Sequence, residues 1–259
     1  MKVIILGNGQ SSILLSQILE ERNIDYRIVV RRSTSNIDKN QDSKINLDKI
    51  CYVSSINELN LLSIKENFDY THIYNFAGNS FVQDSQLNFE YFLYNNSKIL
   101  WSIYAISSYS PDLWVFHPLS SEIIDGYNKI NDLNYIVLNP RNAYGLAKAN
   151  DYYSSKIIRS NSSLKINASI MFNHESKYRP PQFFTKKVVS YFQKKTNKNT
   201  LNIYNTQSER DWGSAKEFME IIYNSGLEKK SDTTMLGTGT LMKVEKFIDT
   251  CFEILNAPY

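Results

Sequence analysis

The feature that most restricts the fold lies at the start of the chain, where an apolar strand, a glycine turn and a helix are predicted in succession. Residues 1–6 (MKVIIL) form a β-branched apolar run, and Gly7-Asn8-Gly9 interrupts it. Residues 11–21 then repeat apolar side chains at helical spacing. This order is typical of the first unit of a parallel sheet.

The rest of the chain repeats the alternation of short apolar runs and helical segments. Further strands are predicted at residues 26–30, 50–53, 70–76, 113–116 and 165–172. Further helices are predicted at residues 56–66, 90–108, 144–157, 184–194 and 242–255. The pattern predicts an α/β protein with a Rossmann-like, doubly wound parallel sheet and helices on both faces. No repeat or Pro/Gly-rich hinge divides the chain.

Composition excludes several functional classes. The 259 residues suit one large domain, with or without a small appendage, and 29 basic against 26 acidic residues leave no basic stripe for nucleic acid or a membrane anchor. Cys51 and Cys251 are too few and too far apart for a disulfide framework. The first apolar run is too short to span a bilayer. We therefore expect a soluble, cytoplasmic protein that binds neither nucleic acid nor membrane and holds no metal.

The turn after the first strand has the position and length of a dinucleotide-binding loop. Its glycines let the backbone approach a pyrophosphate, and the following helix offers N–H donors. Ser12 stands where a third glycine is expected, so a plain strand–turn–helix remains the alternative. The predicted cofactor contacts in this loop are Gly7, Gly9, Gln10, Ser11 and Ser12.

Arg31, Arg32 and Ser33 follow the second predicted strand. An NAD enzyme places an acidic residue there for the ribose 2′-hydroxyl, and this chain has none. Two guanidiniums and a hydroxyl suit a 2′-phosphate, which predicts NADP. The alternative is a solvated basic turn.

Tyr144 and Lys148 are four residues apart at the start of a predicted helix, so they lie one turn apart on one face. A neighbouring ammonium stabilises a phenolate, which lets a tyrosine take a proton from an alcohol or sugar hydroxyl. By itself the pair is equally typical of an ordinary amphipathic helix.

Ser120, Ser121 and Glu122 follow the fifth predicted strand, at the edge where open α/β sheets bind ligands. A hydroxyl there can bind a substrate hydroxyl alongside Tyr144, and a carboxylate beside it can act as a second acid or base. A Ser-Ser-Glu helix cap is the alternative.

Together these features resemble the extended short-chain dehydrogenase/reductases, and Asn75-Phe-Ala-Gly78 strengthens the resemblance. Within that superfamily the chain is similar to the GDP-mannose 4,6-dehydratases over essentially its whole length. Four stretches carry this closer similarity: residues 31–36 (RRSTSN), 120–122 (SSE), 172–176 (FNHES) and 210–216 (RDWGSAK).

The resemblance implies roles for individual residues in a cycle that uses NADP and yields a 4-keto-6-deoxy sugar nucleotide. Tyr144 would deprotonate the hexose 4-hydroxyl, Lys148 would hold the nicotinamide ribose, and Ser120 would take a position usually filled by threonine. Glu122 would remove the C5 proton. Ala77 is expected against the cofactor. The expected substrate contacts are Ser121, Asn173, Glu175, Arg179 and Arg210.

The resemblance also implies an organisation in two parts. Residues 1–172 would form the NADP-binding domain with the catalytic residues, and residues 173–259 a small substrate-binding portion interleaved with the end of the sheet. That portion is abbreviated, because family members continue well beyond the equivalent of Tyr259. The 31–36 loop resembles one that meets a neighbouring subunit, which suggests a homodimer or homotetramer.

Three functions remain open at this point. The first is a nucleotide-sugar 4,6-dehydratase, which Glu122 beside Ser120 favours. The second is an NADPH-dependent reductase or epimerase of a 4-keto sugar nucleotide, which does not need Glu122. The third is a non-catalytic NADP-binding protein, favoured by the imperfect glycine loop and the short substrate-binding portion, and opposed by the presence of Tyr144, Lys148, Ser120 and Glu122 together.

Overall fold

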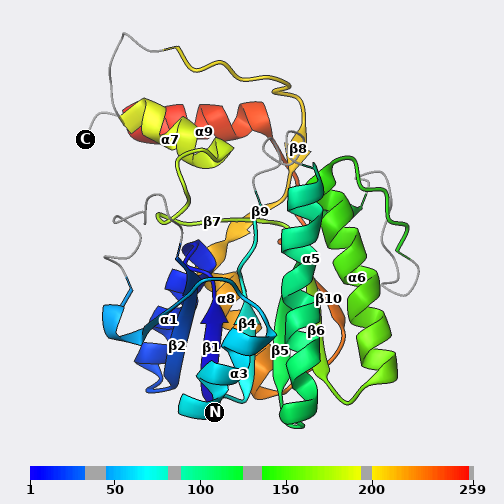
Figure 1. Ribbon diagram of the computed structural model, residues 1–259. Helices are drawn as coiled ribbons and strands as arrows, with labels where there is room; N and C mark the ends of the chain where they lie inside the picture. The colour runs from blue at the N-terminus through cyan, green and yellow to red at the C-terminus, as the bar shows by residue number, and fades with distance from the viewer. Residues whose placement is uncertain (33–44, 81–88, 125–135, 194–199, 257–259) are drawn as a thin grey trace.

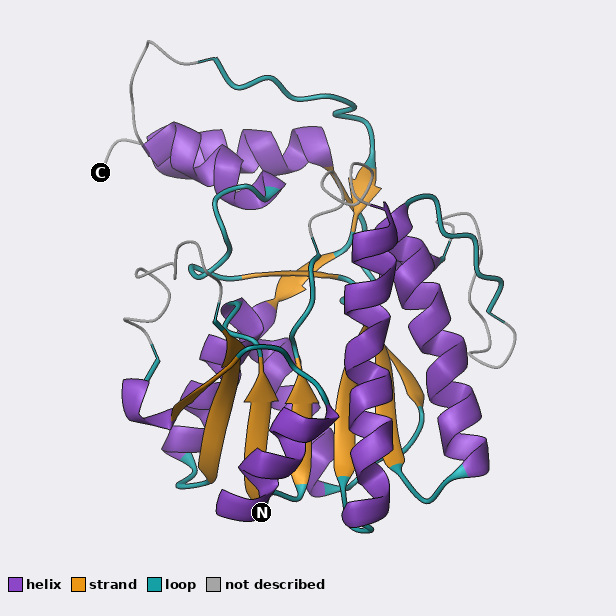
Figure 2. Ribbon diagram, in the orientation of Figure 1, coloured by secondary structure: helices purple, strands orange, loops and turns teal. Residues whose placement is uncertain are grey.

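A seven-stranded parallel sheet forms the centre of the protein, seen in a computed structural model that describes residues 1–32, 45–80, 89–124, 136–193 and 200–256. The strand order is β10-β6-β5-β4-β1-β2-β3, and every neighbouring pair is parallel. The strands are β1 (Lys2–Leu6), β2 (Asp25–Arg31), β3 (Ile50–Val53), β4 (His72–Asn75), β5 (Trp114–Ser120), β6 (Lys165–Met171) and β10 (Thr233–Leu236). Figure 2 shows this sheet between two layers of helices.

Helices cover both faces of the sheet. The described helices are α1 (Gln10–Glu21), α3 (Glu58–Asn67), α5 (Phe89–Ile106), α6 (Ala143–Asn161), α7 (Phe184–Gln193), α8 (Ala215–Leu227) and α9 (Val244–Asn256). One core cluster joins the sheet to α1 and α8, and the other joins it to α3, α5 and α6. The predicted fold class, a doubly wound Rossmann-like α/β protein, is confirmed.

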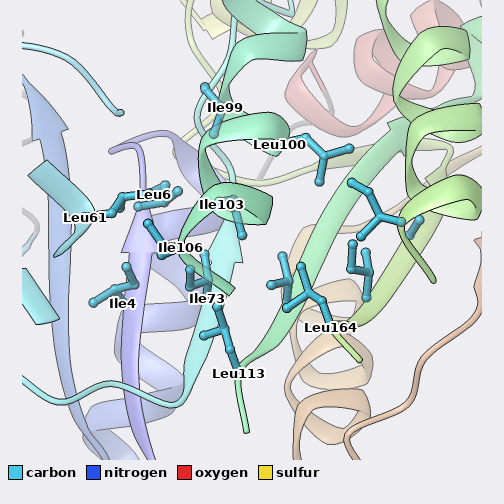
Figure 3. Packing of buried hydrophobic residues seen from close by; sticks show 14 of the residues in the cluster. Ile4, Leu6, Leu61, Ile73, Ile99, Leu100, Ile103, Ile106, Leu113 and Leu164 are labelled. Carbon is cyan, nitrogen blue, oxygen red and sulfur yellow. The ribbon is translucent and has the colours of Figure 1, made fainter. Parts of the chain in front are cut away.

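The side chains of β1 alternate between the two faces of the sheet, and both sets are buried. Val3 and Ile5 belong to the cluster under α1 and α8, whereas Ile4 and Leu6 belong to the opposite cluster. Side chains alternate across a strand, so an all-apolar strand must be covered on both faces. Figure 3 shows Ile4 and Leu6 in the second cluster beside Ile73 of β4 and Ile103 and Ile106 of α5.

The order of the strands creates the place for a ligand. From β1 the chain builds outward through β2 to β3, and then returns to β4 on the other side of β1. The loops that follow β1 and β4 therefore lead in opposite directions along the sheet. This leaves a crevice between the carboxyl ends of the two strands. Gly7 follows β1 and Ala77 closely follows β4, so both lie at this point.

The residues after Met171 contribute to two regions. α8 and β10 complete the sheet layer, and β10 pairs with β6 from Thr233↔Ala168 to Leu236↔Met171. Figure 1 shows α7 and α9 side by side above the carboxyl edge of the sheet. Two small sheets join these regions, and their strands are β7 (Asn173–Glu175) with β9 (Trp212–Ser214) and β8 (Glu209–Arg210) with β11 (Met242–Lys243).

Short 3-10 turns complete the described elements. They are η1 (Leu47–Lys49), η2 (Ser107–Tyr109) and η3 (Ser121–Ile123). Among the described residues, no helix combines the length and apolar character that a membrane crossing requires.

Candidate active site

A cleft of about 1080 Å³ lies at the carboxyl edge of the sheet, between the strand ends and α7. Its walls bring together most of the side chains singled out from the sequence, although they are spread over the chain. The predicted site residues that line it are Gly7, Gly9, Gln10, Ser11, Arg31, Ala77, Ser120, Ser121, Glu122, Tyr144, Lys148, Asn173 and Arg179.

The turn after β1 is shaped for close approach by a ligand. Gly7 has a φ of +97°, and a Cβ there would lie 3.0 Å from both the Phe76 carbonyl oxygen and the Ala77 nitrogen. Glycine is therefore required at this position. Gly9 caps α1 without a side-chain hydrogen bond to the first turn, so no side chain of the cap covers the helix N-terminus beside the cleft. The donors and dipole of such a terminus fit the pyrophosphate of a dinucleotide.

The side chains that follow the turn connect it to the strand β7. Gln10 Nε2 donates to the His174 carbonyl oxygen at 2.8 Å, and Gln10 Oε1 accepts from Ser176 Oγ at 2.9 Å. Ser11 Oγ lies 3.4 Å from His174 Nε2. Ser12 is fully buried and does not line the cleft, so its predicted side-chain contact with a cofactor is not supported by the structure. A small side chain suits this buried position, which explains why serine can replace glycine.

Of the two described arginines at the end of β2, one lies at the cleft. Arg31 is exposed and lines it. The Arg32 guanidinium lies 5.7 Å from the centre of the Tyr52 ring, and Arg32 does not line the cleft. Ser33 lies outside the described residues. Arg31 is thus the one of the two described arginines that the structure places at the cleft.

Helix α6 presents Tyr144 and Lys148 to the cleft. It begins at Ala143 because Asn142 Oδ1 accepts a hydrogen bond from Gly145 N at 2.7 Å, which is an N-cap. Tyr144 is half-buried and Lys148 is buried. The Lys148 ammonium donates to the Pro118 carbonyl oxygen at 2.8 Å and lies 3.4 Å from Asp151 Oδ2.

The segment after β5 places a hydroxyl and a carboxylate beside α6. Ser120 Oγ accepts from Glu122 N at 3.2 Å, which is the helix cap predicted as an alternative role. Ser120 also lines the cleft, so the two roles occur together. Glu122 is exposed, and its Oε2 accepts from Asn142 Nδ2 at 2.8 Å. The residue that caps α6 therefore also holds the Glu122 carboxylate.

Arg179 is a further cation at the cleft, and it interacts with the tyrosine. Its guanidinium pairs with Glu175 at 3.2 Å, stacks over Phe183 at 3.7 Å and interacts electrostatically with Tyr144. Burial lowers the pKa of Arg179, whereas the charges of Glu175 and Tyr144 oppose that change. Burial raises the pKa of Glu175, and Arg179 and the hydroxyl of Thr185 oppose this. Glu175 does not line the cleft, and its side chain pairs with Arg179, which does.

Arg210 is not brought to the cleft. It is exposed on β8, and its Nη1 donates to the Glu209 carbonyl oxygen at 2.7 Å. The neighbouring residues of the Arg-Asp-Trp stretch have structural contacts. Asp211 is buried and accepts from the backbone of Thr238 at 3.0 Å, and Trp212 packs on Phe247 with ring centres 5.0 Å apart.

Several residues that shape the site were not identified from the sequence. His174 lines the cleft, its Nδ1 donates to the Phe172 carbonyl oxygen at 2.9 Å, and burial lowers its pKa to about 4. It lies inside the Phe-Asn-His-Glu-Ser stretch, which was a signal for it. Asn142, His117 and Asp151 were also not identified, because the contacts between Asn142 and Glu122 and between His117 and Asp151 join residues distant in sequence. Within the described ranges, no three His, Cys, Asp or Glu side chains gather as metal ligands would.

The strand order, the glycine cradle and the tyrosine–lysine helix together define an α/β protein of the extended short-chain dehydrogenase/reductase class. Residues 4–258 match the family model described as GDP-mannose 4,6 dehydratase, and the chain belongs to this family.

Known proteins show the same similarity at low identity. The human GDP-mannose 4,6 dehydratase is 25% identical over 264 residues, which cover 94% of this chain and 69% of the human protein. The Dictyostelium discoideum protein of the same name is 26% identical over 205 residues, which cover 76% of this chain and 57% of that protein.

Solved structures show the same fold. A UDP-glucose 4-epimerase from Thermotoga maritima, solved with UDP-glucose, superposes with a TM-score of 0.84 at 15% identity and covers 100% of this chain and 84% of its own. A dTDP-glucose 4,6-dehydratase from Streptomyces venezuelae, solved with NAD, gives a TM-score of 0.84 at 16% identity and covers 100% and 82%. The resemblance predicted from the motifs, to the extended superfamily and to this family within it, is confirmed.

Proposed function

We propose that this protein is an NADP-dependent nucleotide-sugar 4,6-dehydratase that acts on a GDP-mannose-like substrate and forms a 4-keto-6-deoxy sugar nucleotide. The observation that carries the proposal is the Glu122 carboxylate, which Asn142 holds beside the Ser120 and Tyr144 side chains at one cleft. Dehydration needs a base for the C5 proton in addition to the base for the 4-hydroxyl, whereas reduction of a 4-keto group needs only one proton donor, at the C4 oxygen.

Each residue has a defined task in this proposal. Tyr144 takes the proton of the hexose 4-hydroxyl, and the Lys148 ammonium stabilises the phenolate that performs this step. Ser120 donates a hydrogen bond to the same substrate oxygen. NADP, which the turn after β1 and Lys148 would hold, would supply the hydride acceptor for C4 and the hydride donor for C6.

Glu122 acts at the second stage, because the ketone at C4 acidifies the proton at C5. The carboxylate takes that proton and passes it to the C6 hydroxyl, which leaves as water, and a proton returns to C5 when the hydride reaches C6. The hydride returned to C6 leaves the cofactor in its starting form, so a dehydratase consumes no NADPH.

The substrate contacts are assigned to residues after Met171. Arg179 is a half-buried guanidinium at the cleft and suits the diphosphate, and Asn173 lines the same cleft. Ser121 remains a candidate contact, since it also lines the cleft. We propose that residues 1–172 hold the cofactor and residues 173–259 the sugar nucleotide.

The dehydratase is tested by incubating the purified protein with GDP-mannose and other sugar nucleotides, without added NADPH, and measuring product mass. We expect one substrate to lose one water. Glu122→Gln should abolish this loss while NADP binding is retained, and Glu58→Gln, which changes an exposed carboxylate on α3, should have no effect. A product that forms only when NADPH is supplied and consumed would instead identify a reductase. NADP binding with no turnover on 4-keto substrates would identify a binding protein.

The cofactor choice is tested separately by calorimetry with NADP⁺ and NAD⁺. Arg31 at the cleft supports NADP, since a guanidinium can pair with a 2′-phosphate. Arg31→Ala should weaken NADP⁺ binding by about tenfold or more and leave NAD⁺ binding nearly unchanged. Arg22→Ala, which removes an exposed arginine on the far end of α1, serves as the control. Tighter binding of NAD⁺ than of NADP⁺ by the parent protein would contradict the assignment.

We also propose a cytoplasmic homodimer or homotetramer. The exposed faces of α5 and α6, which pack side by side, support association because they carry large apolar side chains. These are Tyr94, Trp101, Tyr153 and Ile157, each between 44% and 62% exposed. Light scattering in the presence of NADP tests this, and a monomer at all concentrations would refute it.

A further inference from the structure

A chain of buried polar side chains runs from the middle of the sheet to the lysine of the cleft. Asn75 Nδ2 donates to His117 Nδ1 at 3.0 Å, and His117 Nε2 donates to Asp151 Oδ2 at 3.0 Å. The Lys148 ammonium lies 3.4 Å from the same carboxylate oxygen. The exposed fractions of these four residues are 5% or less. The chain links β4, β5 and α6, and the proposed reaction gives no role to its first three members.

The hydrogen bonds fix the protonation of the imidazole. Asn75 Oδ1 accepts from Ala77 N at 3.2 Å, so the amide nitrogen faces His117. An amide nitrogen only donates, so His117 Nδ1 must be the acceptor and Nε2 must carry the proton. Burial lowers the pKa of His117, and the nearby Asp151 only partly offsets this, so the ring is neutral.

The carboxylate of Asp151 is ionised in this arrangement. Burial alone would raise its pKa, but the charge of Lys148 and the hydrogen bond from His117 lower it below the ordinary value. The groups that act on the Asp151 and His117 side chains are each other and Lys148, and Tyr144 lies one turn from Lys148 on α6. The other oxygen, Oδ1, is buried with no hydrogen-bond partner among the described residues. A buried carboxylate with one unpaired oxygen costs stability, which points to a role other than stabilising the fold.

The geometry points to Asp151 and His117 as positioning residues for Lys148. Asp151 is the counter-ion of the buried ammonium, and a buried charge without a partner is costly. The Pro118 carbonyl and Asp151 take two of the three ammonium hydrogens, which leaves the third for the cleft that Lys148 lines. His117, fixed by Asn75, holds the carboxylate in place. This inference rests on the proposed use of Lys148 at the cofactor and the tyrosine.

The test follows the protonation of Lys148 directly, by NMR of protein labelled at the lysine Cε, with Lys148→Arg to assign the signal. Asp151→Asn should lower the pH at which Lys148 loses its proton by about one unit or more. It should also weaken NADP⁺ binding at pH values where that proton is lost, and leave binding nearly unchanged near neutral pH. Ser155→Ala, which removes a buried hydroxyl one turn further along α6, should change the melting temperature without moving either curve.

A second pair of variants covers the case in which Asp151→Asn does not fold. His117→Gln keeps a donor for Asp151 and an acceptor for Asn75, so the Lys148 titration should stay close to that of the parent. His117→Leu removes the donor and should shift the titration downward. Superimposable titrations for all foldable variants, with only melting temperatures changed, would overturn the proposal. Because the titration needs neither cofactor nor sugar nucleotide, its outcome is independent of whether the protein proves to be a dehydratase.

Discussion

Asn142 performs two tasks with one side chain. Its carbonyl oxygen caps α6 through Gly145 N, and its amide nitrogen donates to the Glu122 carboxylate. The start of the catalytic helix and the orientation of the proposed C5 base therefore depend on the same residue. The hydrogen bond orients the carboxylate, and a base must be within reach of the proton that it removes.

Substitutions at Asn142 should separate the two tasks. Serine caps helices about as well as asparagine but has no N–H to reach Glu122, so Asn142→Ser should keep the melting temperature and lower the dehydration rate by about tenfold. Asn142→Ala should lower the rate similarly and also lower the free energy of unfolding by about 1 kcal/mol. Steady-state rates and urea unfolding measure these effects, and full activity in the serine variant would disprove the role at Glu122.

The sequence predicted most of the site residues that line the cleft, but it did not predict the side chains that hold them in place. Gly7, Tyr144 and Glu122 follow recognisable strand or helix signals, so their meeting at one edge could be predicted from the topology. The contacts of Asn142, Asp151 and Glu175 depend on side-chain directions that only the packed structure defines. Arg210 was assigned to the substrate from its motif, but β8 holds it away from the cleft.

At the scale of elements, the contact between α6 and the segment after β5 depends on the absence of a side chain at Gly145. A Cβ there would lie 2.7 Å from the Glu122 carbonyl oxygen and 3.3 Å from Pro140 Cβ. The first of these contacts is with backbone, so the helix start would have to move. That movement would displace Tyr144, which precedes Gly145.

Gly145→Ala is therefore expected to destabilise the protein despite the helix propensity of alanine. Alanine is favoured over glycine in a helix by about 1 kcal/mol, whereas overpacking costs about 1–3 kcal/mol. We expect a net loss of stability together with lower turnover. Ser160→Ala, on the exposed end of the same helix, should keep full turnover. A stabilised and fully active Gly145→Ala variant would contradict this, because the segment after β5 would then have moved to make room for the Cβ without displacing Tyr144.

Six strands of the large sheet were predicted near their observed positions, but β10 and α8 were not predicted. β10 is a short strand, and its pairing partner β6 is more than sixty residues earlier, so local pattern alone did not identify it. α8 did carry a local signal, since Ser214 and Glu217 have the spacing of a capping box and Ser214 Oγ accepts from Glu217 N at 3.4 Å.

At the scale of the whole molecule, the histidines should make the protein sensitive to mild acid. The chain has 3 histidines, and burial lowers the pKa of each, to about 4 for His72 and His174. In the unfolded chain each takes a proton near pH 6.5. Below that pH the unfolded state binds more protons than the native state, so stability falls as pH falls.

The free energy of unfolding should therefore decrease between pH 7 and pH 5, by at most about 4 kcal/mol per pH unit if all three histidines act fully. Glu175 opposes this by one proton at most, because its pKa is raised in the folded state. Urea unfolding across this range measures the slope. His72→Gln, which can still donate to the Gly226 carbonyl oxygen, should reduce the slope by about one proton. If the free energy of unfolding did not change across this range, the histidines would take up protons in the native state as they do in the unfolded chain.

α8 and β10 lie late in the sequence, and this has a consequence for synthesis on the ribosome. When β6 has emerged, its outer edge and the apolar face that α8 will cover are both open to solvent, and they stay so until residues 215–236 follow. Unpaired edges and exposed apolar faces are the surfaces through which incomplete chains aggregate. The nascent protein therefore passes through a vulnerable interval after its first 171 residues have been made, and slow translation of the segment between β6 and β10 would prolong it.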